Sequence, residues 1–152
     1  MGRTKPTVKN DYVVGLTDGE GCFHVSLMEM SAYSSGTRVQ MHFFIKMQEK
    51  DRPLLEKVKN TLRCGTVYFQ KEKRPNHCQC YRYSVYSFKD IFNNIIPFFR
   101  QYPLQSVSKQ ESFKAFCKIA HLVKRRVHMT RSGIEQIRLL KSRMNRKTVG
   151  LA

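Results

Sequence analysis

Two acidic residues stand one residue apart between glycines in the stretch YVVGLTDGEG, residues 12–21. Asp18 and Glu20 follow an apolar run with helical spacing, which predicts a helix over residues 7–18. At the C-terminal end of a helix the backbone dipole disfavours negative charge. A simple helix stop explains one glycine, but it does not explain three glycines that alternate with two acids. The two acids therefore indicate a functional site rather than a simple helix end.

A metal ion fits these acids best. The spacing G-x-x-x-G-x-G is not that of a phosphate-cradling loop, which opens a helix rather than closing one. Oxygen ligands from Glu20 and a neighbouring carbonyl suit Mg²⁺ that keeps several waters and binds a substrate phosphate. One carboxylate is too few for such a site. Gly15 and Gly19 share one helix face, so two copies of the helix could cross there and bring two Glu20 side chains together.

Composition indicates a folded nucleic-acid-binding protein. The 152 residues include 28 Lys and Arg against 11 acids, a net charge of +17 that favours a phosphate-rich partner. A ribosomal-type binder would explain this charge, but not the DGEG sequence. No apolar run resembles a membrane helix or a signal peptide, which predicts a location in the cytoplasm (the bacterial nucleoid) or an organelle matrix rather than secretion.

The five cysteines predict free thiols. The sequence His77-Cys78-Gln79-Cys80 resembles half of a zinc site, but no second cluster of ligands accompanies it.

Hydrophobic periodicity predicts an α+β fold. Strands are expected over residues 22–30, 38–48, 66–70 and 79–86. Helices are expected to begin near Asp51, at Ser87 (ending before Pro97), at Ser108 and at Ser132, the last two from capping-box patterns. Four antiparallel strands with helices on one face leave a polar face free, and such a face can read bases in a DNA major groove.

At YVVGLTDGEG, residues 12–21, the chain resembles the LAGLIDADG homing endonucleases, in the variant of the motif that ends D-G-E-G. The resemblance continues through RVQMHFFIKMQEKDRPLLEKV, YPLQSVSKQESFKAFCKI and HMTRSGIEQIRLLKSRMN, and covers about residues 10–147 of a single domain spanning residues 1–152. It implies the αββαββα fold with a four-stranded antiparallel DNA-binding saddle, here with an extra C-terminal helix. The αββαββα topology agrees with the order of the elements derived above, from the first helix to the one that begins at Ser87.

The resemblance also implies a mechanism and its residues. Glu20 matches the metal-binding catalytic acid, Gly19 the residue whose carbonyl assists, and Asp18 the earlier acid of the motif. Gln48 matches a residue that positions solvent, and Arg52 matches a basic neighbour. Lys109 matches a residue that stabilises developing charge. The implied reaction is hydrolysis of both DNA strands with Mg²⁺, leaving 3′ overhangs; Mn²⁺ or Ca²⁺ could replace Mg²⁺ in binding.

The motif occurs once, so the resemblance implies a homodimer on a long, near-palindromic DNA target, with the chain's own intron RNA as a possible further partner. The expected subunit interface comprises Val14, Gly15, Leu16 and Gly19. The expected DNA-contacting residues are the outward-facing strand residues His24, Ser26, Arg38, Gln40, His42, Lys46, Tyr68, Gln70, Arg82 and Ser84. Ten basic residues and one acid between Lys118 and Lys147 form either a solvated face or a contact to the DNA backbone.

Two other functions share this fold. An RNA-splicing maturase would not need cleavage, and a noncatalytic DNA-binding regulator would be expected to lose the acid. Because Glu20 is retained, the sequence favours an intron-encoded nuclease over both alternatives.

Overall fold

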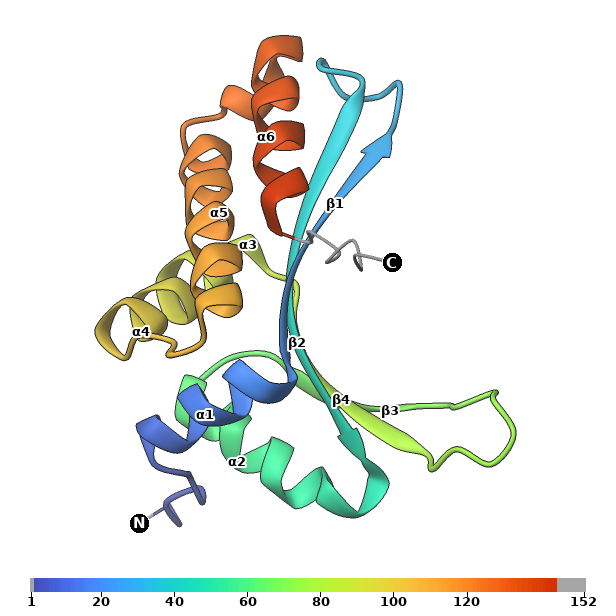
Figure 1. Cartoon of the computed structure of the whole chain (residues 1–152), viewed down its shortest axis with the longest axis vertical. Coiled ribbons are helices and arrows are strands. Elements are labelled where there is room, and N and C mark those ends of the chain that lie inside the picture. Colours follow the sequence, from blue (N-terminus) through green and yellow to red (C-terminus); the bar gives the residue numbers. More distant parts are fainter. Residues whose placement is uncertain (1, 145–152) are drawn as a thin grey trace, which may run out of the picture. The chain divides into compact units, whose positions relative to one another are not determined.

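The computed structural model describes residues 2–144, and it confirms the α+β class. The four strands form one antiparallel sheet with the order β1-β2-β4-β3 (Figure 1). The main elements are α1 (Asn10–Glu20), β1 (Gly21–Glu29), β2 (Thr37–Gln48), α2 (Arg52–Leu62), β3 (Thr66–Gln70), β4 (Cys80–Val85), α3 (Phe88–Asp90), α4 (Ile96–Gln101), α5 (Val107–Lys124) and α6 (Arg131–Met144). The last residues of the expected core, 145–147, lie outside the described part of the chain.

The chain divides into two compact units. The first comprises residues up to 22 together with 42–106, and the second comprises residues 23–41 together with those from 107 onward. The boundary passes through β1 and β2, so each of these strands contributes to both units.

The core of the first unit forms between the sheet and the helices α1, α2 and α4. The alternation predicted for β2 is confirmed, because Phe43 and Ile45 are fully buried on the helix side. The Phe43 ring lies 6.3 Å from that of Tyr83 and 5.7 Å from that of Phe99. The buried hydroxyl of Tyr83 donates a hydrogen bond to the Cys64 carbonyl at 2.7 Å, which offsets the cost of removing it from water.

The core of the second unit joins β1 from Phe23 onward to α5 and α6, which lie side by side (Figure 1). Phe23 packs with Phe113 and Phe116 of α5, with ring centroids 5.4 and 5.2 Å apart. Ile134 and Ile137 of α6 are also buried. The Ser112 hydroxyl donates to the Met144 carbonyl at 2.8 Å and so ties the start of α5 to the end of α6.

The first helix is displaced from its predicted position. It covers residues 10–20 instead of 7–18, so Glu20 is its last residue and Gly21 begins β1 directly. Residues 2–9 stay outside the helix because they bind α2: the Val8 amide donates to Thr61 Oγ1 at 3.0 Å, and Asn60 donates to the Pro6 carbonyl at 2.8 Å. Long-range hydrogen bonds therefore override the local helical pattern at this end.

Two of the three predicted serine caps are wrong. Ser87 caps its helix as expected, since its hydroxyl accepts from the Asp90 amide at 3.4 Å. Ser108 instead lies inside α5. At α6 the cap is Thr130, two residues before the predicted Ser132, and its hydroxyl accepts from the Gly133 amide at 3.0 Å. Gly133 is required there, because a Cβ at this position would collide with the Val127 carbonyl.

The helix that begins after Ser87 does not end before Pro97. A π-helical turn over Ile91–Ile95 connects α3 to α4, and Pro97 lies in the first turn of α4. Proline is tolerated in the first turn of a helix because its missing N–H is not needed there. The Asn94 side chain donates to the Leu62 carbonyl at 3.1 Å, at the end of α2.

Candidate active site

Glu20 and Gln48 line the same cleft in the first unit. The cleft has a volume of about 750 Å³ and is otherwise lined by residues from the end of β2, the following turn and the β3–β4 loop: Lys46, Met47, Lys50, Asp51, Glu72, Arg74, Asn76, His77, Cys78 and Cys80. Glu20 is exposed, and its carboxylate makes no hydrogen bond or ion pair with other residues in the part of the chain that the structure describes. Its carboxylate is therefore available to an external ligand.

Asp18 is placed very differently from Glu20, although only one residue separates them. Its carboxylate accepts hydrogen bonds from the Gln105 amide at 2.9 Å, the Ser106 amide at 3.1 Å and the Ser106 hydroxyl at 2.9 Å. These contacts attach the end of α1 to the segment immediately before α5. The structure thus gives Asp18 a positioning role, and its predicted catalytic role remains a prediction.

Arg52 and Lys109 do not line this cleft. Arg52, at the start of α2, has its guanidinium 5.0 Å from the centre of the Tyr81 ring and its Nε 3.8 Å from a Glu56 oxygen. Lys109 lies in the first turns of α5, in the second unit. The proposed roles of both residues in catalysis remain predictions.

The glycines of the motif serve two purposes. A Cβ added at Gly15 or Gly19 would meet nothing within 4 Å, so this face of α1 is not packed against the described chain. A Cβ at Gly21 would lie 2.6 Å from Thr17 Cγ2, so Gly21 is needed for packing within the unit. Val14, expected at a subunit interface, is only 6% exposed and is already packed inside its own unit. Leu16 is half-buried.

The sheet face opposite the helices carries the predicted DNA-contacting residues of the first unit. Strand register places Lys46 of β2 and Tyr68 of β3 on either side of Arg82 of β4. Gln70 lies one pleat further along β3, opposite Cys80. In the second unit, the alternation of buried Phe23 and Val25 places His24 and Ser26 together on the other face of β1, and their side chains hydrogen-bond at 3.2 Å. Arg38 and Gln40 are half-buried on β2.

His42 and Ser84 are on the predicted face but are not exposed. The Tyr86 ring stacks on the His42 imidazole at 3.9 Å between centroids, leaving His42 only 7% exposed. Ser84, 2% exposed, hydrogen-bonds both His42 Nε2 at 3.1 Å and the Tyr68 hydroxyl at 3.2 Å. Both residues are thus less accessible than their outward-facing positions imply, and their contacts to DNA remain predictions. These side chains form a buried support that orients Tyr68 and Tyr86.

Sequence reasoning missed Tyr86 and the role of Phe44. Phe44 interrupts the polar series of β2, and the structure shows why: the guanidinium of Arg82 lies 4.1 Å from the centre of its ring. Such a contact fixes the arginine over an aromatic surface. The interruption of the alternation was the signal that could have revealed this pair.

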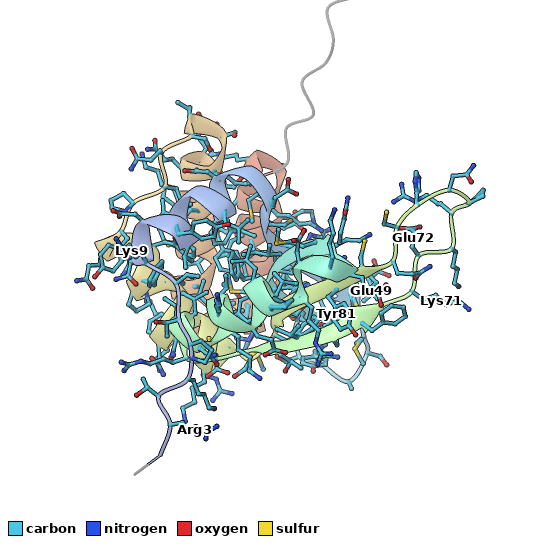
Figure 2. The ribbon with its side chains drawn as sticks, turned by 90° about the horizontal axis from the view of Figure 1, so that it is seen from below. Arg3, Lys9, Glu49, Lys71, Glu72 and Tyr81 are labelled. Atoms are coloured by element: carbon cyan, nitrogen blue, oxygen red, sulfur yellow. The ribbon has the colours of Figure 1, made fainter. Side chains whose placement is uncertain are left out.

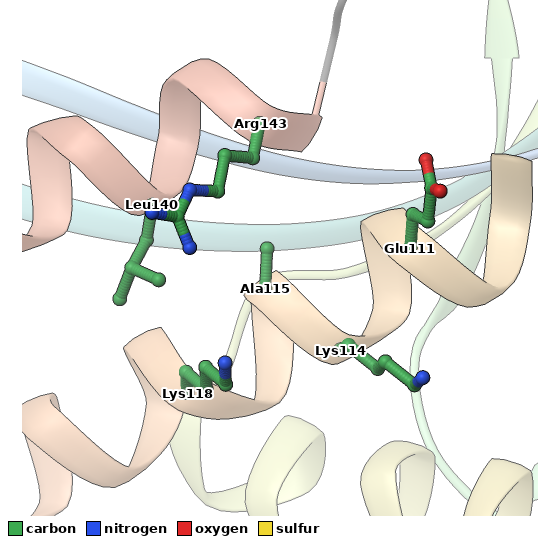
Figure 3. Close-up of a pocket in the computed structure, with 6 residues that line it drawn as sticks. All are labelled: Glu111, Lys114, Ala115, Lys118, Leu140 and Arg143. Atoms are coloured by element: carbon green, nitrogen blue, oxygen red, sulfur yellow. The ribbon is translucent and has the colours of Figure 1, made fainter.

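The second unit contains a smaller hollow between α5 and α6. It has a volume of about 260 Å³ and is lined by Glu111, Lys114, Ala115 and Lys118 of α5 with Leu140 and Arg143 of α6 (Figure 3). Three cations against one acid give this hollow a positive character, in keeping with the basic run that starts at Lys118. Arg146 and Lys147 of that run lie outside the described residues.

Comparison with known proteins decides the family. Residues 13–120 match the family model described as LAGLIDADG endonuclease. The chain belongs to this family. It is 31% identical over 132 residues to a probable intron-encoded endonuclease 2 of Neurospora crassa, covering 87% of this chain and 26% of that protein. It is also 31% identical over 102 residues to a probable intron-encoded DNA endonuclease 1 of Mycosarcoma maydis, covering 67% of this chain and 34% of that protein.

Solved structures of LAGLIDADG endonucleases confirm the fold. The homing endonuclease I-TnaI matches with a TM-score of 0.81 and 29% identity, over 91% of this chain and 89% of that chain. I-SmaMI bound to cleaved DNA matches with a TM-score of 0.83 and 30% identity, over 93% of this chain but 45% of that one. The chain therefore spans about a third or less of these curated relatives, about half of I-SmaMI and most of I-TnaI.

Among residues 2–144, no group of three or more His, Cys, Asp or Glu side chains is arranged to hold a metal ion. Over the same residues, no helix has the length and apolar character needed to cross a membrane.

Proposed function

We propose that this protein is a metal-dependent, site-specific DNA endonuclease that cuts both strands of a long, near-palindromic target as a homodimer. The observation that carries the proposal is Glu20, an exposed carboxylate at the end of α1, in a polar cleft with Gln48 and beside an unpacked glycine face. I-SmaMI, a relative with the same fold, has been crystallised with cleaved DNA and, in the presence of calcium ions, with an uncleaved target.

The donor atoms fit a hard divalent cation such as Mg²⁺. Glu20 supplies one carboxylate and Gly19 a backbone carbonyl, and oxygen ligands of this kind suit an ion that completes its shell with water and phosphate oxygens. When bound, the ion lowers the pKa of water and neutralises charge on the scissile phosphate. Asp51 lies in the same cleft and adds negative charge.

The chain's own residues position this reaction. The hydrogen bonds of Asp18 fix the end of α1 and hence the location of Glu20. Gln48, on the exposed edge of the cleft, can orient a water molecule through its amide. The outer sheet face supplies Lys46, Tyr68 and Arg82 for contacts to bases and phosphates.

A second copy of the chain supplies the other half of the site. At Gly15 and Gly19 of helix α1 an added Cβ would have open space, and faces of this type allow helices to approach closely. Two copies crossing there would place two Glu20 carboxylates near one axis, one for each DNA strand. Because two relatives are named as intron-encoded, we also propose an intron origin, and thus activity in the compartment that holds the intron's genome.

A plasmid that carries the joined sequences flanking the reading frame of the protein provides the test. With Mg²⁺ the wild type should linearise it and leave 3′ overhangs, and a chelator should stop the reaction. The variant Glu20→Gln should bind this DNA with unchanged affinity but cut it about a thousandfold more slowly, the effect of several kcal/mol of lost charge stabilisation.

Glu135→Gln serves as the matched control, because this exposed acid on α6 pairs only at 3.5 Å with Arg138. It should cut at the wild-type rate. Cutting by Glu20→Gln at that same rate would refute the assignment of Glu20.

A further inference from the structure

The loop between β3 and β4 contains one acid among several cations. Its sequence over residues 71–79, KEKRPNHCQ, includes Lys71, Lys73 and Arg74. Figure 2 shows Lys71 and Glu72 at the start of this loop. Unlike Glu20, which is exposed in the same cleft, Glu72 has a side chain that is only 9% exposed.

The Glu72 carboxylate holds Arg74 through three hydrogen bonds. Arg74 Nε donates to Oε1 and Nη2 to Oε2, both at 2.9 Å, and the Arg74 amide donates to Oε1 at 3.0 Å. This two-point arrangement is the one that a guanidinium also makes with a phosphate group. The Arg74 side chain is 66% exposed, so its outer edge faces solvent while its inner edge is occupied.

Glu72 also reaches from the loop to β2. Its Oε2 lies 3.5 Å from Nζ of Lys46, which is opposite Arg82 on the outer sheet face. One carboxylate thus holds two cations that come from different elements. Hydrogen bonds from the Arg74 side chain and amide, with the charges of Arg74 and Lys46, keep the pKa of Glu72 well below its usual range. Glu72 is therefore ionised at neutral pH.

A second set of contacts fixes the backbone of Glu72. Its amide donates to Gln79 Oε1 at 2.9 Å, and Gln79 Nε2 donates to the Glu72 carbonyl at 3.4 Å. The Gln79 carbonyl in turn accepts from the Glu49 amide at 2.8 Å. Both ends of the loop are thereby fixed to the turn that follows β2.

We propose that Glu72 is a specificity-determining positioning residue, whose carboxylate occupies Arg74 and Lys46 as a phosphate would and so weakens binding to DNA of unrelated sequence. This inference rests on the proposed DNA-binding function. To contact an arbitrary phosphate, Arg74 must first leave a two-point hydrogen bond. A target whose phosphates match the fixed positions of Arg74 and Lys46 can contact the solvent-facing edges of both side chains. The hydrogen bonds between Arg74 and Glu72 then stay intact.

The test measures binding of a 30-base-pair duplex of random sequence by fluorescence anisotropy, without metal, between 50 and 200 mM KCl. Relative to the wild type, Glu72→Gln should bind about threefold to tenfold more tightly at 50 mM. Because Glu72→Gln releases both Arg74 and Lys46, the slope of log K against log salt should steepen by about 0.9 for each additional phosphate contact, up to about 1.8 for two. The double variant E72Q/R74Q should lose the share of this increase that the guanidinium supplies and keep at most about 0.9, the share of Lys46.

Glu56→Gln provides the control for net charge. Glu56 is an acid of the same unit that pairs with Arg52 on α2, and its removal changes the total charge equally. Its salt slope should match that of the wild type. An equal slope for Glu72→Gln and Glu56→Gln would overturn the proposal.

Two other outcomes separate the remaining explanations. A wild type that fails to bind the duplex at 50 mM KCl contradicts the proposed function itself. If Glu72→Gln binds DNA like the wild type but loses Mg²⁺-dependent cleavage, then Glu72 is a metal ligand and the proposal is wrong. Should Glu72→Gln unfold, Arg74→Lys keeps the charge while removing the two-point contact, and it should steepen the salt slope in the same direction.

Discussion

The two sides of helix α1 differ in what they contact. On one side, Val13 and Thr17 are fully buried, and Gly21 closes against Thr17 just after the helix ends. On the other side, Gly15 and Gly19 meet nothing within 4 Å. Glu20 is exposed because it is the last residue of the helix. The same residue type therefore serves internal packing at one position and an external surface at another. The open side is the one that a second copy of the chain would contact in the proposed dimer.

The substitution Gly15→Leu on the open side of α1 is expected to have the largest effect, a loss of subunit association. A Cβ at Gly15 meets nothing within 4 Å, and Gly15 lines a hollow of about 300 Å³ that can take the rest of a leucine side chain, so the melting temperature should not fall. In a symmetric dimer the clash occurs twice, which costs about 2–6 kcal/mol and weakens association roughly thirtyfold or more. Sedimentation equilibrium measures this change, and double-strand cleavage should fall with it.

Gly2→Leu is the control, because Gly2 also has open space but lies outside α1. It should leave both association and cleavage unchanged. If Gly15→Leu destabilises the isolated chain instead, then the open side is packed internally.

The packed side should respond to Gly21→Ala through stability alone. The added Cβ would lie 2.6 Å from Thr17 Cγ2 and 2.9 Å from the Thr17 carbonyl oxygen. Such overpacking costs about 1–3 kcal/mol, measurable by urea unfolding. Gly15→Ala should have the opposite sign, a gain of up to about 1 kcal/mol, because alanine is the better helix former. Equal effects at the two positions would remove the distinction between the sides.

Asp18→Asn tests whether the second acid of the motif is structural. An amide offers one acceptor where the carboxylate accepts three hydrogen bonds, so unfolding should become easier by about 1–2 kcal/mol. Below the melting temperature the variant should still cut DNA, unlike Glu20→Gln. A stable but inactive Asp18→Asn would instead support the catalytic role predicted from sequence. Asp11→Asn, at an exposed position of the same helix, is the control.

The smallest effect concerns pH and lies outside α1. Burial, and secondarily Lys141, lowers the pKa of His24 from its ordinary value of 6.5. The unfolded chain then binds a proton more readily than the folded one. The stability contributed by neutral His24 is therefore complete above about pH 6.5 and is lost as the pH falls through the lowered pKa. His24→Gln should flatten the melting temperature between pH 7.5 and 5.5 slightly; an unchanged profile would argue against this environment.

Local patterns were sufficient to predict the class, the strands and their faces. The alternation in residues 38–48 placed Phe43 and Ile45 inside and Lys46 outside, because side-chain direction in a strand depends only on neighbouring residues. The motif likewise indicated an available Glu20 and a bare glycine face, since glycine spacing alone sets that face.

What the sequence could not provide are contacts between distant residues. Tyr86 covers His42, Ser106 binds Asp18, and Glu72 binds Lys46, in each case across 26 or more positions of the chain. Burial of His42 and the occupied state of Asp18 follow only from these pairings. The displaced cap at Thr130 has a local origin instead, because Gly133 must fit beneath the Val127 carbonyl, which the capping-box pattern alone does not reveal.

In the proposed dimer, the open side of α1 binds a second copy of the chain and so pairs two Glu20 carboxylates. Light scattering on the purified protein, alone and on DNA, measures whether this dimer forms. A protein mass near twice 17.9 kDa is expected. A protein mass that stays at 17.9 kDa, on DNA that is nevertheless cut in both strands, would contradict it.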